Sequence, residues 1–222
     1  MRKKPLSIKL IIIAAFITIP FFFSNKSRYE KRDIHGITVL VDTHIDTSDK
    51  IFDHVEEQIG IIKKATPKKN FKLLNGVKIT VLATSINIGG HYTPSTTNNK
   101  SYGIQGNIKI YNGHIIQYSK EKGNPIVIHE LAHAYHDKLP KNWKEFIKKT
   151  YESAISQGLY KSVEGKSDRK IKKTYALKNE YEYFAELSAK YFAGNYYFPF
   201  NKEELQDYDI KGYEMVNHAW TK

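Results

Sequence analysis

Short segments in the first half of the chain alternate apolar and polar residues, which is the pattern of half-buried β-strands. This alternation covers residues 36–41 and 77–83. Between them, residues 49–65 carry apolar residues at helical spacing. The apolar face of this predicted helix consists of Ile51, Val55, Ile59 and Ile62. The first half of the chain is therefore predicted to hold two strands separated by an amphipathic helix.

Two further strand-like segments, residues 104–111 and 114–118, flank the dipeptide Asn112-Gly113. Asn-Gly favours the tight turn of a two-residue β-hairpin. The segment before this predicted hairpin, residues 87–103, is rich in Gly, Thr and Asn. A loop of this length in a compact domain is either disordered or functional, and its position favours a lid over a cleft.

The second half of the chain has the signals of longer helices. Residues 125–139 are apolar enough for a buried helix, with Asn124 as its N-cap, Pro125 at the first helical position and Pro140 ending it. Residues 179–194 form a second candidate, capped by Asn179 and stopped by Gly194. The pattern predicts an α+β fold with a small twisted sheet packed over the 125–139 helix and a mainly helical C-terminal half.

The first of these helices contains the run His129-Glu130-Leu131-Ala132-His133. One helical turn separates the two histidines, so both imidazoles lie on one face, with a glutamate between them. This is the arrangement of a zinc site with a general base beside its ligands. The alternative is a core helix that carries two ordinary surface histidines.

A catalytic zinc site needs a third protein ligand. The extended motif HExxHxxGxxH is excluded, because His136 occupies the glycine position and Leu139 the final histidine position. The other source is a carboxylate on a second helix, where Glu182 and Glu186 lie four residues apart and share a face. One of them can bind the metal while the other orients a histidine. The alternative is a solvated acidic face, although the residues around this pair are apolar.

The two motifs together resemble a known family. HELAHAYH at 129–136 and TYALKNEYEYFAE at 174–186 are similar to the catalytic domain of the anthrax lethal factor metallopeptidases and the related Pro-Pro endopeptidases. The resemblance implies a zincin-like metallopeptidase fold and one catalytic Zn²⁺. It implies that the metal ligands are His129, His133 and Glu182.

The resemblance also implies the roles of the other site residues. Glu130 corresponds to the general base, Tyr175 to the tyrosine that stabilises the transition state, and Glu186 to the carboxylate behind the ligands. Ala132 departs from the glycine that Pro-Pro endopeptidases generally carry before the second histidine. The large receptor-binding and substrate-docking domains of lethal factor are missing from this chain, so its delivery route is not implied.

These residues lead us to expect an exported zinc-dependent endopeptidase that hydrolyses peptide bonds of an extracellular or cell-surface protein. Cleavage near proline is an expectation from the resemblance alone. The predicted 104–118 hairpin is the candidate edge strand that aligns an extended substrate by main-chain pairing. The Lys-rich residues 161–173 are expected to be a solvated connection that leads to Tyr175. The alternative function is a non-catalytic cell-surface or cell-wall binding domain with a structural or vestigial zinc site. His136 is not expected to bind the metal.

The N-terminus indicates the compartment. Four basic residues precede an uncharged, largely apolar stretch from residue 10 to 25, so residues 1–25 are expected to be a signal peptide or an N-terminal membrane anchor, followed by one peptidase domain over 26–222. The chain has no cysteine, which excludes disulfides and a lipid-modified cysteine. Without residues 1–25 the net charge falls from +12 to +8, which favours anionic cell-wall or membrane surfaces. Nucleic acid is not an expected partner, because the lysines are dispersed along the chain.

Overall fold

The computed structural model describes residues 27–83, 90–94, 106–111, 115, 125–166 and 169–222. The predicted signal or anchor segment, the predicted cap Asn124 and most of the predicted 87–103 lid lie outside these residues. In the part of the chain that the structure describes, no helix is long and apolar enough to cross a bilayer.

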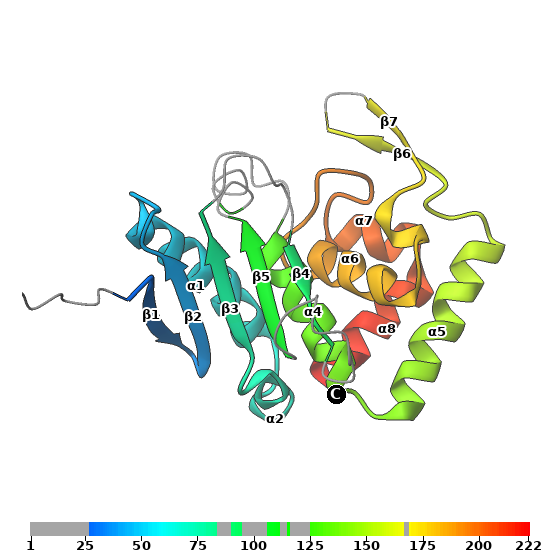
Figure 1. Cartoon of the computed structure of the whole chain (residues 1–222). Coiled ribbons are helices and arrows are strands. Elements are labelled where there is room, and N and C mark those ends of the chain that lie inside the picture. The colour runs from blue at the N-terminus through cyan, green and yellow to red at the C-terminus, as the bar shows by residue number, and fades with distance from the viewer. Residues whose placement is uncertain (1–26, 84–89, 95–105, 112–114, 116–124, 167–168) are drawn as a thin grey trace, which may run out of the picture.

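A five-stranded mixed sheet forms one half of the molecule (Figure 1). Its strands are β1 (Tyr29–Ile34), β2 (Ile37–Asp42), β3 (Lys78–Leu82), β4 (Gly90–Tyr92) and β5 (Asn107–Tyr111), in the spatial order β1-β2-β3-β5-β4. The central three strands are parallel, and β1 and β4 pair antiparallel at the two edges. The alternation that predicted β2 and β3 is confirmed, because Val39, Val41, Ile79 and Val81 are all buried.

The predicted hairpin at Asn112-Gly113 is wrong in its second arm. Its first arm forms β5, but Ile115, the one residue of the second arm that the structure describes, is helical and buried. The strand that pairs antiparallel with β5 is instead β4, which comes from the predicted lid and places Gly90 opposite Ile110. The Asn-Gly signal is local, whereas this pairing joins segments about twenty residues apart and has no local signature.

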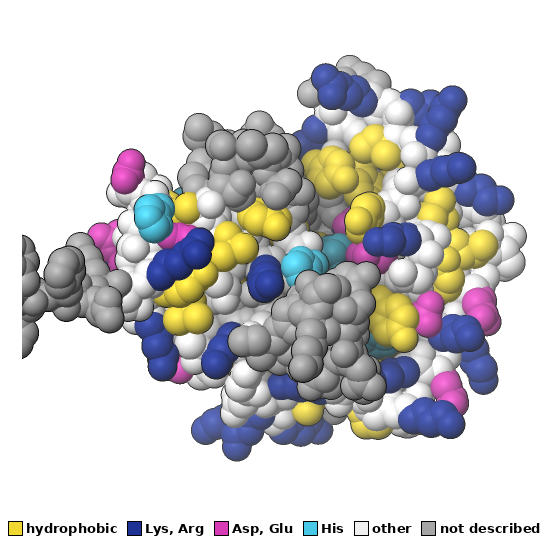
Figure 2. All heavy atoms as spheres, in the orientation of Figure 1, with side chains coloured by type: hydrophobic (Ala, Val, Ile, Leu, Met, Phe, Trp, Pro, Cys, Tyr) yellow, Lys and Arg dark blue, Asp and Glu magenta, His cyan; other side chains and the backbone are white. Residues whose placement is uncertain are grey.

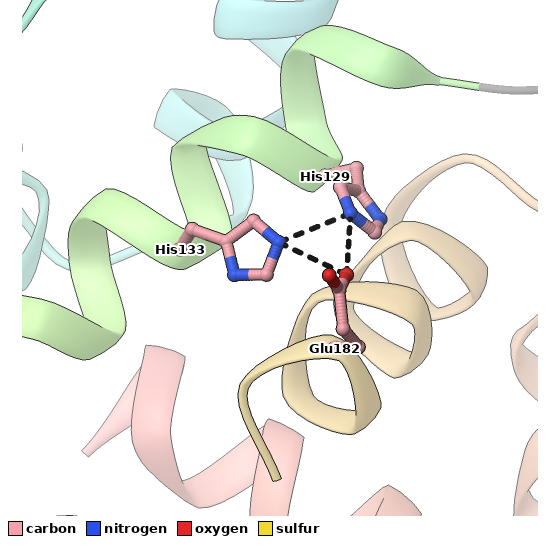
Figure 3. Close-up of side chains that lie close together, drawn as sticks. All are labelled: His129, His133 and Glu182. Carbon is pink, nitrogen blue, oxygen red and sulfur yellow. Dashed lines mark hydrogen bonds and ion pairs between the residues drawn. The ribbon is translucent and has the colours of Figure 1, made fainter. Parts of the chain in front are cut away.

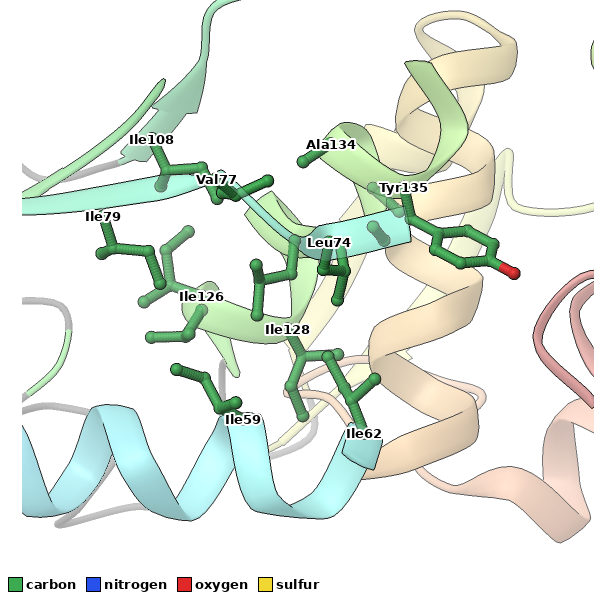
Figure 4. Packing of buried hydrophobic residues seen from close by; sticks show 14 of the residues in the cluster. Ile59, Ile62, Leu74, Val77, Ile79, Ile108, Ile126, Ile128, Ala134 and Tyr135 are labelled. Atoms are coloured by element: carbon green, nitrogen blue, oxygen red, sulfur yellow. The ribbon is translucent and has the colours of Figure 1, made fainter. Parts of the chain in front are cut away.

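Helices cover the sheet on one face and make up the other half of the molecule (Figure 1). They are α1 (Ser48–Ala65), α2 (Lys68–Phe71), α4 (Ile126–Lys138), α5 (Lys141–Ser156), α6 (Glu180–Phe192), α7 (Lys202–Tyr208) and α8 (Ile210–Thr221), with 3₁₀ turns at Lys72–Leu74 and Tyr175–Leu177. The predicted α+β class is thereby confirmed. Figure 4 shows how α4 fills the centre of the core, where Ile126 and Ile128 pack against Ile59 and Ile62 of α1 and against Ile79 of the sheet.

The start of α4 is held by a neighbouring helix. Pro125 occupies the N-cap position, one residue later than predicted, and it offers no side-chain cap. The missing acceptor is Gln58 of α1, whose Oε1 accepts from the backbone N–H of Val127 at 3.1 Å and of Ile128 at 3.4 Å. Helix α1 therefore fixes the first turn of α4, directly before His129.

The predicted ends of α6 are confirmed. Asn179 Oδ1 accepts from the backbone N–H of Glu182 at 2.9 Å, and Gly194 follows the helix with φ of +88°. The Lys-rich segment before α6 keeps its basic residues exposed and leads to Tyr175, as predicted. Within it, β6 (Ser162–Gly165) and β7 (Arg169–Lys172) pair as a hairpin that the sequence pattern did not predict. Its pairing depends on the cross-strand contact of Val163 with Ile171, which a lysine-dominated pattern conceals.

Candidate metal site

Helices α4 and α6 bring three potential metal ligands together (Figure 3). His129 Nε2 lies 3.1 Å from His133 Nε2, and Glu182 Oε2 lies 3.3 Å and 3.2 Å from these two nitrogens. The histidines come from successive turns of one helix and the carboxylate from the first turn of the other. These three side chains form a mostly buried group that could bind a metal ion.

The carboxylate of Glu182 has two different surroundings. Oε2 is buried and makes no hydrogen bond of good geometry with the described residues, although both imidazoles lie beside it. Oε1 accepts from Lys178 Nζ at 3.1 Å. Burial alone would raise the pKa of Glu182, but the two imidazoles outweigh it and hold that pKa well below its usual range. Oε2 is thus an ionised oxygen directed at a point that it shares with two nitrogens.

A second carboxylate lies behind His129. Glu186 Oε1 is 3.3 Å from His129 Nδ1, while Glu186 Oε2 accepts from the hydroxyl of Tyr197 and from Asn195 Nδ2 at 3.0 Å. Burial lowers the pKa of His129, but Glu182 and Glu186 raise it to about 10. The two ring nitrogens therefore face different carboxylates, and Nδ1–H toward Glu186 leaves Nε2 free to bind a metal.

Sequence reasoning missed the layer that supports Glu186. Lys190 is completely buried, donates to the backbone oxygens of Tyr197 at 3.0 Å and Pro199 at 3.1 Å, and lies 3.5 Å from the centre of the Tyr197 ring. Burial lowers the pKa of Lys190 to about 7. The one signal in the sequence is a lysine on the buried face of α6, four residues after Glu186. Asn195 and Tyr197 follow the helix and carry no such signal.

Glu130 lies against the edge strand of the sheet. Glu130 is buried, with 3% of the residue exposed. The backbone N–H of Tyr92 in β4 donates to its carboxylate. Its Oε2 atom has no hydrogen-bond partner among the described residues. Burial raises the pKa of Glu130 to about 7. A Cβ at Gly90 would lie only 2.9 Å from Glu130 Oε1. Strand β4 therefore sets the position of this carboxylate.

The metal-binding group and Glu130 line one cavity of about 640 Å³. Figure 2 shows histidine side chains in the hollow between the sheet and the helical half. Three tyrosines that the molecule leaves exposed, Tyr175, Tyr181 and Tyr196, also line it. Tyr175 is 53% exposed, and its hydroxyl lies 3.4 Å from Lys178 Nζ. Glu186 lines it as well, so the cavity brings together the predicted ligands, the predicted base Glu130, Tyr175 and Glu186.

His136 is not part of the group that could bind a metal. Its ring is buried and packs against Tyr181 and Phe184, with ring centres 5.0 Å and 5.4 Å away. Neither ring nitrogen has a hydrogen-bond partner among the described residues, and burial lowers the pKa of His136 to about 4. The ring is therefore neutral at physiological pH and serves as packing beneath the cavity wall.

Comparison with known proteins identifies no related protein. No family model matches the sequence, and neither curated proteins nor solved structures give a match.

Proposed function

We propose that this protein is an exported zinc-dependent endopeptidase with a zincin-like fold. The observation that carries this proposal is the triangle of Nε2, Nε2 and Oε2 atoms, 3.1–3.3 Å on a side, in one cavity with the buried Glu130. Ligand bonds of about 2.0–2.1 Å in a tetrahedral arrangement separate ligand atoms by about 3.3 Å, and two imidazoles with one carboxylate are a common donor set of catalytic zinc. The residues present therefore fit Zn²⁺, held by His129, His133 and Glu182.

Zinc bound there would supply an acidified water and polarise the carbonyl of the peptide bond. Glu130 is the general base that takes the proton of the attacking water and passes it to the leaving amine. Two features support this role: one carboxylate oxygen has no hydrogen-bond partner among the described residues, and the pKa of about 7 lies close to neutral pH. The hydrogen bond from the backbone N–H of Tyr92 holds the Glu130 carboxylate in place.

Tyr175 is the donor for the oxyanion that develops on the carbonyl. It follows the β6–β7 hairpin after two residues and lines the same cavity as the metal ligands, which supports this role. Lys178 lies 4.7 Å from the centre of the Tyr175 ring and also donates to Glu182, so its ammonium group holds the phenol beside the ligand set. Glu186 fixes the ring orientation of His129.

The substrate is a peptide segment of a protein outside the cell. The exposed tyrosines Tyr175, Tyr181 and Tyr196 offer flat faces of the kind that bind proline-containing peptides, which supports cleavage near proline. The basic and apolar character of residues 1–25 supports export, either by signal cleavage or with retention as an anchor, and residues 26–222 form the peptidase domain. A binding domain with structural zinc is not favoured: a closed structural site takes four protein ligands, and the described group offers three.

The test compares the wild type with Glu130→Gln on a proline-enriched peptide library, with zinc content measured in parallel. We expect Glu130→Gln to bind zinc equally and to lose about 10²–10⁴-fold in cleavage rate, the usual contribution of a general base. Glu56→Gln, which changes an exposed glutamate of α1, is the matched control and should cleave as the wild type does. Absence of cleavage by the zinc-loaded wild type, or equal cleavage by Glu130→Gln, would reject the proposal.

A further inference from the structure

The hairpin of β6 and β7 concentrates positive charge. Residues 161–173 contain six basic and two acidic residues, so this short segment carries a net charge of +4 out of +12 for the chain. The basic residues, all exposed, are Lys161, Lys166, Arg169, Lys170, Lys172 and Lys173. Figure 2 shows Lys and Arg side chains gathered at the end of the molecule where Figure 1 places the hairpin. Residues 63–72 form a second run, of five lysines, so the lysines are not evenly dispersed along the chain.

The described carboxylates do not neutralise this charge. Arg169, Lys170 and Lys172 have no described Asp or Glu oxygen within ion-pair distance, although Glu164 stands opposite Lys170 in the ladder. Because alternate residues of a strand point to opposite faces, Lys170 and Lys172 share one face, while Ile171 packs on the other with Val163. One face of β7 therefore presents the ammonium groups of Lys170 and Lys172, which have no ion-pair partner among the described residues.

The hairpin is joined to the wall of the cavity at two places. Tyr175 follows β7 after two residues. Strand β6 is hydrogen-bonded to the segment after α6: the N–H of Lys166 donates to the backbone oxygen of Tyr196 at 2.9 Å, and the N–H of Phe198 donates to that of Glu164 at 2.7 Å. Tyr175 and Tyr196 both line the cavity. The backbone of the hairpin is thus joined directly to two residues of the cavity wall.

We infer that the β6–β7 hairpin binds an acidic segment of the peptide substrate, next to the residues that occupy the cavity. This inference rests on the proposed endopeptidase function. A peptide that leaves the cavity past Tyr175 and Tyr196 meets the ammonium groups of the hairpin, and acidic residues complement them in charge. The direct connection to these two tyrosines favours the substrate itself as the ligand over a membrane or cell-wall surface.

The test uses two peptide libraries with the same randomised core and a short tail of aspartates or of asparagines, placed at either end. We expect the wild type to cleave the aspartate-tailed library with a higher kcat/KM. The double variant Lys170→Gln/Lys172→Gln should lose about fivefold on that library, since each exposed charge pair contributes a small factor, and nothing on the asparagine-tailed one. Lys68→Gln/Lys69→Gln on α2 is the control with the same charge change and should not alter the preference. Equal cleavage of both libraries by the wild type would overturn the inference.

A binding measurement separates this inference from the proposed function. Fluorescence anisotropy of labelled tailed peptides, with metal removed by chelator, needs no turnover. Tighter binding of the aspartate tail that Lys170→Gln/Lys172→Gln abolishes supports the hairpin as an acidic-peptide site, even if the wild type cleaves nothing and the peptidase proposal fails. Equal affinity for both tails overturns it. The inference is also overturned if Lys170→Gln/Lys172→Gln loses binding only to vesicles that contain phosphatidylglycerol, because the partner of the hairpin is then an anionic surface.

Discussion

Gly90→Ala tests whether strand β4 positions Glu130. The added Cβ would lie 2.9 Å from Glu130 Oε1, 3.1 Å from Cγ and 3.2 Å from Cδ, whereas ordinary contact begins at 3.4 Å. The carboxylate or β4 must therefore shift by about half an ångström. A misplacement of about 1 Å can cost about 10²-fold in rate, so half of that shift corresponds to about tenfold in kcat/KM, or about 1.4 kcal/mol of transition-state stabilisation.

The same substitution should leave folding and metal binding intact. Gly90 does not have a positive φ, so alanine can adopt its backbone conformation, and the loss of glycine freedom in the unfolded chain offsets the steric cost by about 0.4–1 kcal/mol. The three atoms nearest to the new methyl group all belong to Glu130, and none belongs to a metal ligand. We therefore expect an unchanged zinc affinity and a melting temperature within a few degrees of the wild type.

The assay combines kcat/KM on a cleavable library peptide, zinc stoichiometry and thermal unfolding. Gly60→Ala in α1 is the matched control: a Cβ there meets no atom within 4 Å, so this helix should gain about 1 kcal/mol of stability with unaltered activity. Full activity of zinc-loaded Gly90→Ala would refute the positioning of Glu130 by β4. Loss of zinc in this variant would also refute it, because the methyl group would then act on the ligands.

Four further outcomes follow from the site. Glu186→Gln should weaken zinc affinity about 10–100-fold in competition with a chromophoric chelator, because the orientation of His129 is lost. Tyr175→Phe should lower kcat by about 10²-fold at full zinc occupancy, measured by steady-state kinetics. Burial lowers the pKa of Lys190 to about 7 in the folded protein, against about 10 in the unfolded chain, so the unfolded chain binds more protons between these pH values. The free energy of unfolding should therefore rise between pH 7 and 9, by up to about 1.4 kcal/mol per pH unit. Lys190→Met should remove that slope in urea titrations at several pH values. Gln58→Ala should cost about 1–2 kcal/mol in the same titrations, since it leaves the first N–H groups of α4 without an acceptor.

The parts of the site that depend on one helix could be predicted from the sequence. The spacing of His129 and His133 is fixed by helix geometry, and the caps of α6 place Glu182 in its first turn. Their meeting required only that both helices bury their apolar faces in one core. Local pattern therefore predicted the two histidines and limited the third ligand to Glu182 or Glu186, while only the family resemblance selected Glu182, which the structure places beside the histidines.

The parts that depend on non-local pairing could not be predicted. The three residues of β4 have no alternating pattern, and their place next to Glu130 follows from pairing with β5 and from packing on α4. Tyr197 reaches Glu186 only because β6 and Lys190 together hold the segment after α6. In both cases the functional contact is made by backbone groups or by a loop, which carry little side-chain signal in sequence.

The charges of the site favour a bound metal cation independently of the sequence motif. Three buried or mostly buried carboxylates, Glu130, Glu182 and Glu186, surround His129 and His133. Burial lowers the pKa of His133, while the pKa of His129 is raised to about 10. The three acidic groups therefore face one imidazolium and the half-exposed ammonium group of Lys178, which donates to Glu182. An excess of buried like charge is costly unless a counter-ion balances it. A metal cation where Nε2, Nε2 and Oε2 converge would replace the proton of His129 and provide that balance. It would leave Glu130 Oε2, which has no hydrogen-bond partner among the described residues, available for a water molecule.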